Sequence, residues 1–70
     1  MVLSEIRNNG SYRVKRLHDC SSETHHHLEN LGFIPGEMIT VVSRIGGNLI
    51  VNVKGSRVAL SSELAQHITV

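Results

Sequence analysis

The side chains best suited to chemistry in this sequence gather in one short segment. The segment contains His18, Cys20, His25, His26, His27 and Glu29. Imidazole, thiolate and carboxylate groups are common ligands of divalent metal ions in the series from iron to zinc. Successive helical residues point about 100° apart, so three consecutive histidines on a helix cannot all face one ion.

Cys20, His25 and Glu29 form the best candidate set of metal ligands. His25 and Glu29 are four residues apart and would share a helix face, which Cys20 could reach from the start of the helix. The sequence contains no CxxC or HExxH motif, and one cysteine is equally explained as a small buried side chain. We therefore assign no resident metal or cofactor, and keep these three residues as candidates for weak binding of a divalent transition metal.

The sequence lacks the residue patterns of an enzyme. It has no Ser/His/Asp set in a plausible arrangement, no paired carboxylates and no glycine-rich phosphate loop with its lysine. Gly46-Gly47 lies between two apolar runs and predicts a hairpin. We expect no catalytic residue and no enzymatic activity.

The basic residues near the N-terminus do not predict nucleic-acid binding. Small barrels that bind single strands place stacking aromatic side chains in a basic groove. The basic residues are Arg7, Arg13, Lys15 and Arg16. Only Tyr12 offers an aromatic ring beside them, and the net charge is only +1. A solvated strand face explains these charges.

One helix must position the histidine-rich segment. Ser21 or Ser22 can cap its first turn, Glu23 favours the positive helix end, and Gly32 provides the stop. We predict a helix over about Ser22–Leu31. Its inner side should carry Thr24, His27 or Leu28, and Leu31. His25 and His26 should then face solvent.

The rest of the chain predicts short strands joined by tight turns. Leu3–Ile6 could form a turn or short helix that places two apolar side chains on the core. The expected strands are Tyr12–Leu17, Met38–Ile45, Leu49–Val53, Val58–Leu60 and Ile68–Val70. Ile39, Val41 and Ile45 should share one face of the second strand. Pro35-Gly36 should make a turn, and a helical turn over Leu64–Gln66 should precede the last strand.

These elements predict a mainly β fold, a small and partly open barrel with one helix between strands 1 and 2. Seventy residues fit one domain, residues 1–70. One cysteine suits a reducing cytosol. The N-terminus lacks the apolar run of a signal peptide, and no window approaches the roughly 20 apolar residues of a membrane span. We expect a cytoplasmic protein that does not insert into a membrane.

The sequence resembles the FeoA family over essentially its whole length. One diagnostic stretch is Leu28-x-x-Leu31-Gly32-Phe33-x-Pro35-Gly36, followed by a Val/Ile strand and a glycine hairpin. The ending Val58-Ala59-Leu60-Ser61-x-Glu63-Leu64-Ala65-x-x-Ile68-x-Val70 is similar to that of the family. Two features depart from the pattern: His25-His26-His27 replaces the usual Arg or Lys before the helix leucines, and Gly46-Gly47-Asn48 replaces a Gly-Asp-Pro hairpin.

The resemblance implies an SH3-like barrel and an accessory role in bacterial ferrous iron uptake. The implied partner is FeoB, a membrane permease with a GTPase domain, which would hold this chain at the inner face of the cell membrane. The alternative is a metal-binding regulatory domain, because similar domains end the iron- and manganese-dependent transcription repressors. A weak homo-oligomer is also compatible with the small core.

For the partner-binding surface we predict the exposed helix side and the loop that follows it. The residues are His25, His26, Glu29, Asn30, Phe33, Ile34, Pro35 and Gly36. For the helix side the competing interpretation is a solvated polar face. For the loop it is a structural role, with Phe33 and Ile34 closing the barrel end.

Overall fold

The computed structural model describes residues 1–70 and is mainly β. Its elements, in chain order, are the 3-10 helix η1 (Leu3–Glu5), β1 (Gly10–Arg13), β2 (Arg16–Leu17), α1 (Ser22–Leu31), β3 (Met38–Ile45), β4 (Asn48–Val53), β5 (Ser56–Ser61), α2 (Ser62–Ala65) and β6 (Ile68–Thr69). The bounds of α1 and β3 are those predicted. The predicted turn of helix over Leu64–Gln66 begins two residues earlier, because Ser61 caps it through a hydrogen bond from the Leu64 N–H.

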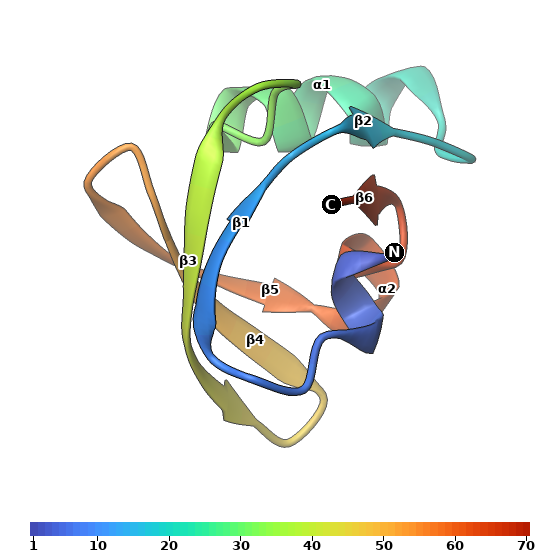
Figure 1. The fold of residues 1–70 in the computed structure, drawn as a ribbon. Helices are drawn as coiled ribbons and strands as arrows, with labels where there is room; N and C mark the ends of the chain where they lie inside the picture. Colours follow the sequence, from blue (N-terminus) through green and yellow to red (C-terminus); the bar gives the residue numbers. More distant parts are fainter.

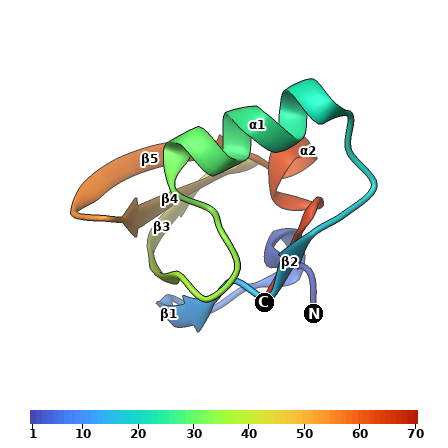
Figure 2. The same cartoon turned by 90° about the horizontal axis from the view of Figure 1, so that it is seen from above.

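The strands form two antiparallel sheets. One has the order β1-β3-β4-β5, and the other pairs β2 with β6. The four-stranded sheet curves around the core, and α1 crosses one end of the barrel (Figure 1). Seen from above, α1 lies on the side of β5, with β1 on the opposite side (Figure 2). The two termini lie side by side, since the Val70 N–H donates to the Met1 carbonyl at 2.8 Å.

The predicted strand Tyr12–Leu17 is wrong as a single element, because the chain bends within it. β1 pairs with β3, whereas β2 pairs with β6 in the other sheet. At the bend Val14 is buried, and it exchanges backbone hydrogen bonds with Gly36 and Glu37. A strand that changes sheets at a corner is a common way to close a small barrel. The helix expected between strands 1 and 2 therefore lies between β2 and β3.

Ile45 does not share the inner face with Ile39 and Val41, contrary to the prediction. The register between β3 and β4 shifts between Val41 and Ser43. This β-bulge changes which side chains point inward, because an extra residue reverses the strand alternation. Ile39 and Val41 are buried, and Ile45 is 66% exposed.

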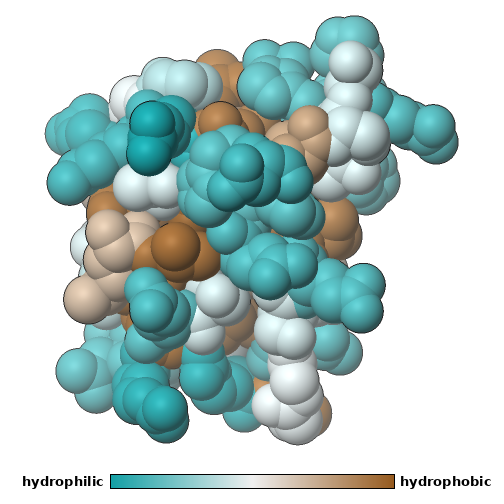
Figure 3. All heavy atoms as spheres, turned by 90° about the vertical axis from the view of Figure 1, so that its right-hand side faces the viewer, coloured by the Kyte–Doolittle hydropathy of each residue, from teal (hydrophilic) through white to brown (hydrophobic).

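A core of aliphatic side chains and one aromatic ring fills the barrel. Its largest fully buried members are Phe33, Leu3, Leu28, Ile39, Leu60 and Ile68. As predicted, the short N-terminal turn contributes two buried apolar side chains, Leu3 and Ile6. On the side that carries β2, β6 and the termini, apolar patches lie between hydrophilic side chains (Figure 3). None of the helices has the length and apolar character needed to span a membrane.

Candidate functional site

Helix α1 is held firmly at both ends, so the positions of its outward side chains are well defined. The Ser21 hydroxyl accepts a hydrogen bond from the Thr24 N–H at 3.1 Å. At the other end Gly32 has φ +108°, and the Phe33 N–H donates to the Leu28 carbonyl at 3.0 Å. Such a paired cap satisfies backbone groups that the helix itself leaves free.

Gly32 is required by packing as well as by backbone conformation. A Cβ at this position would lie 2.9 Å from Cγ2 of Val53 and 3.3 Å from Cδ of Lys54. The close approach brings the end of α1 against the β4–β5 hairpin. The outer side of α1 is thereby fixed relative to the barrel.

The outer side of α1 is polar and centred on one histidine–glutamate pair. Nε2 of His25 lies 3.3 Å from Oε2 of Glu29, and both side chains are partly exposed. The His25 and His26 rings meet edge to face, with centroids 6.4 Å apart. His26 and Asn30 are exposed, whereas Leu28 is fully buried. Of the two residues considered for the inner side, Leu28 takes that place and His27 is exposed.

The loop that follows α1 divides into a buried and an exposed part. Phe33 is fully buried in the core, Ile34 is partly buried, and Pro35 and Gly36 are exposed. The structure therefore removes Phe33 from the predicted contact surface, since a side chain in the core cannot touch a partner.

The exposed part of this loop is hydrogen-bonded to the last residue of β1 and to the residue that follows it. The Gly36 N–H donates to the Val14 carbonyl at 2.8 Å, and Nη1 of Arg13 donates to the Gly36 carbonyl at 3.0 Å. Glu37 then faces Lys54, with Oε1 and Nζ 3.6 Å apart. These contacts hold Pro35 and Gly36 in a defined place beside the end of α1.

The candidate metal ligands are only partly brought together. His25 and Glu29 are adjacent, but no group of three or more His, Cys, Asp or Glu side chains is placed to hold a metal ion. Cys20 is a free, partly buried thiol. The arrangement thus offers at most two protein ligands on α1, and further ligands would have to come from solvent or from another molecule.

A second histidine pair joins residues far apart in the sequence. The His18 N–H donates to the His67 carbonyl at 2.9 Å, and Nδ1 of His67 lies 3.1 Å from the His18 carbonyl. Nε2 of His18 is buried without a hydrogen-bond partner. His67 directly precedes β6. Its contact with His18 could not be predicted from a local sequence pattern, because it depends on the pairing of β2 with β6.

The whole chain matches one family model, and its fold matches solved structures closely. The model is that of the FeoA domain, and the match covers residues 1–70. FeoA from Stenotrophomonas maltophilia, solved with zinc and described as an SH3 domain protein, is 30% identical with a TM-score of 0.84. That match covers 99% of this chain and 87% of the other. Iron(II) transport protein A from Clostridium thermocellum is 31% identical with a TM-score of 0.88, over 99% of this chain and 43% of the other.

The same fold occurs in a metal-dependent repressor. A manganese-dependent transcriptional repressor in complex with manganese gives a TM-score of 0.86 at 24% identity, over 97% of this chain and 34% of the repressor. That likeness concerns the fold alone. No curated protein matches the chain. The predicted SH3-like architecture is confirmed by these structures.

Proposed function

Because the chain belongs to the FeoA family, which is associated with ferrous iron transport, we propose that it is an accessory protein of bacterial ferrous iron uptake. In this role residues 1–70 act as one cytoplasmic interaction module. The module docks on the cytoplasmic side of a FeoB-like GTPase and permease, and supports its uptake or GTPase cycle.

The observation that carries this proposal is the family match over residues 1–70. The geometry of α1 supports it, because a rigidly capped helix presents a polar side without an internal partner element. Binding surfaces on rigid elements lose little conformational entropy on association. The barrel then serves as a scaffold that positions this side.

We propose that the contact surface combines the outer side of α1 with the exposed part of the following loop. It comprises His25, His26, Glu29, Asn30, Ile34, Pro35 and Gly36. Phe33 supports this surface from the core. The partner would also hold the chain at the inner face of the cell membrane.

Pull-down with the cytoplasmic part of the permease tests the proposal. The wild-type chain should be recovered in at least one nucleotide state of the GTPase. Replacing His26 and Asn30 together by alanine should weaken binding roughly tenfold, which corresponds to about 1.4 kcal/mol. Gln66→Ala, an exposed neutral side chain after α2, is the matched control and should bind as wild type. Failure to bind in either nucleotide state would reject the proposal.

A metal-binding regulatory domain is the second candidate function. Its support is that the matched structures include a FeoA with zinc, together with the close His25–Glu29 pair. Calorimetry with Fe(II) or Mn(II) under reducing conditions should then show stoichiometric binding. His25→Ala should weaken it, and Cys20→Ser tests whether the thiol joins the pair; indifference to both changes would eliminate this ligand set.

A further inference from the structure

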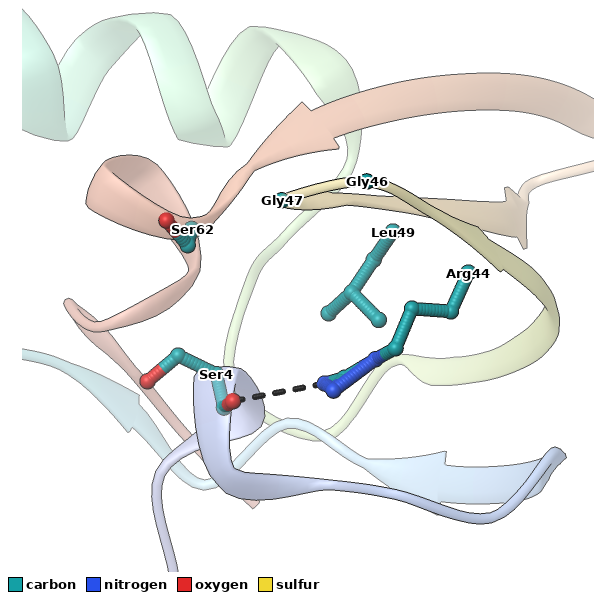
Figure 4. A pocket seen from close by; sticks show the side chains of 6 residues that line it. All are labelled: Ser4, Arg44, Gly46, Gly47, Leu49 and Ser62. Carbon is teal, nitrogen blue, oxygen red and sulfur yellow. Dashed lines mark hydrogen bonds between the residues drawn. The ribbon is translucent and has the colours of Figure 1, made fainter.

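The β-bulge in β3 places one exposed arginine opposite a buried leucine at the end of the barrel. After the register shift, Arg44 pairs with Leu49 of β4. Leu49 is buried, and residues directly opposite on neighbouring strands point to the same face. The Arg44 side chain is exposed and reaches toward Ser4 of the N-terminal turn (Figure 4). The β3–β4 hairpin that carries it lies at the end of the barrel opposite to α1 (Figure 1).

Arg44 contacts the N-terminal turn with only part of its guanidinium group. Nη2 donates to the carbonyls of Ser4, at 3.4 Å, and Ile6. These hydrogen bonds satisfy carbonyl groups in and just after η1. An arginine side chain carries five N–H donors, so those on Nε and Nη1 remain without a partner in the chain. No Asp or Glu lies within ion-pair distance of Arg44.

A small cavity adjoins this arginine. Its volume is about 90 Å³, and its lining residues are Ser4, Arg44, Gly46, Gly47, Leu49 and Ser62 (Figure 4). A water molecule needs only about 10–15 Å³ of such volume, so the cavity has room for a group of several atoms.

The cavity combines donors with an uncompensated positive charge. Two of its six lining residues are serines, and no acidic side chain lines the cavity. The Gly46-Gly47 turn leaves space, because a Cβ on Gly46 would meet no atom within 4 Å. The residue content thus matches an anionic ligand rather than a cation or an apolar one.

We propose that this cavity is a binding site for a single oxyanion, a phosphate or carboxylate group. The guanidinium group of Arg44 suits both groups, because its positive charge and its remaining N–H donors on Nε and Nη1 can bind an oxyanion oxygen. The site lies at the other end of the barrel from the proposed partner surface, and its existence does not depend on the transporter.

NMR titration of the isotope-labelled chain tests the site with inorganic phosphate and, separately, with acetate. Ionic strength is held constant with sodium chloride, so that general screening is the same in every sample. The amide signals of Gly46 and Gly47 and the Nε signal of Arg44 should shift and saturate at millimolar ligand. The ion that saturates at lower concentration identifies which of the two groups the site prefers.

Matched variants distinguish specific binding at this site from a general effect of the protein's charge. Arg44→Gln should weaken binding at least tenfold. Gly47→Ala should weaken it severalfold, because its methyl group would enter the cavity at 4.0 Å from Oγ of Ser62. Arg57→Gln removes the same charge from an exposed position on β5 and should bind as wild type.

Three results would overturn the proposal. The first is that the chemical shifts saturate with neither ion. The second is that a folded Arg44→Gln variant binds the ion as tightly as wild type. The third is that Arg57→Gln loses as much binding as Arg44→Gln does. Arg44→Gln also removes the bonds to η1, so a dispersed spectrum must show that it folds. If it does not fold, Gly47→Ala and Ser62→Ala decide, and unchanged binding in both rejects the site.

Discussion

Gly32 and Gly36 both have positive φ, but only one of them is closely packed. Their φ angles are +108° and +93°. A Cβ on Gly32 would clash with Val53, whereas a Cβ on Gly36 would meet nothing within 4 Å. The two positions therefore separate backbone strain from steric overlap.

We predict that Gly32→Ala destabilises the chain more than Gly36→Ala. Positive φ should cost each variant roughly 1–2 kcal/mol. Overlap with Val53 should add about 1–3 kcal/mol for Gly32 alone. Urea unfolding monitored by circular dichroism measures both free energies. Equal losses would show that the end of α1 does not pack closely on the β4–β5 hairpin.

Phe33 should behave as a core residue and Ile34 as a surface residue, although they are neighbours. Truncating a buried phenylalanine costs about 3–5 kcal/mol, a large part of the stability of a small domain. We therefore expect a thermal melt to show most Phe33→Ala molecules unfolded at temperatures where the wild-type chain is still folded. The half-buried Ile34 should tolerate alanine far better. A Phe33→Ala variant as stable as Ile34→Ala would contradict the burial of this ring.

At the scale of elements, α1 was predictable because its signals are local. The capping serine, the acidic first turn and the glycine stop all lie within the segment itself. Caps act through neighbouring backbone groups and need no distant contact.

Alanine substitutions can test which serine, Ser21 or Ser22, serves as the N-cap of α1. Ser21→Ala should cost about 0.5–2 kcal/mol, because Oγ of Ser21 accepts the Thr24 N–H. The control is Ser22→Ala at the first helical position, where the exposed side chain makes no hydrogen bond. It should change stability by a few tenths of a kcal/mol at most. The difference can be read from denaturant midpoints, and the reverse order would place the cap at Ser22.

The strand errors come from contacts that a local pattern does not contain. The bend at Val14 depends on backbone bonds to Gly36 and Glu37. The bulge after Val41 depends on the register with β4. Both reverse or interrupt the alternation on which strand prediction relies. The outward Ile45 and the placement of Arg44 opposite the buried Leu49 follow from the same bulge, so the cavity beside Arg44 was beyond prediction from the sequence.

For the whole molecule, the family pattern identified the fold and its association with iron transport. The residues of the helix side could be placed on one surface from helical spacing alone, and His25 and Glu29 do lie together. Phe33 could not be assigned in this way, because a glycine-bounded loop residue can point inward or outward. The partner contact itself remains a proposal.

The two proposed sites lie at opposite ends of the barrel and should act independently. Distant substitutions without shared contacts usually have additive effects. We expect the His26/Asn30 double-alanine variant to lose affinity for the permease while binding oxyanion as wild type. Arg44→Gln should show the opposite behaviour. Parallel NMR titrations measure both, and a change of both affinities by one variant would indicate coupling between the ends.

The most direct test of the proposed function is to map the surface that contacts the permease. An amide spectrum of the labelled chain would be followed while the unlabelled cytoplasmic part of a FeoB-like permease is added. We predict that shifts concentrate on residues 25–30 and 34–36. The absence of any shift, or shifts confined to the exposed side of β5 around Arg57 and Ala59, would contradict the proposed role of this surface.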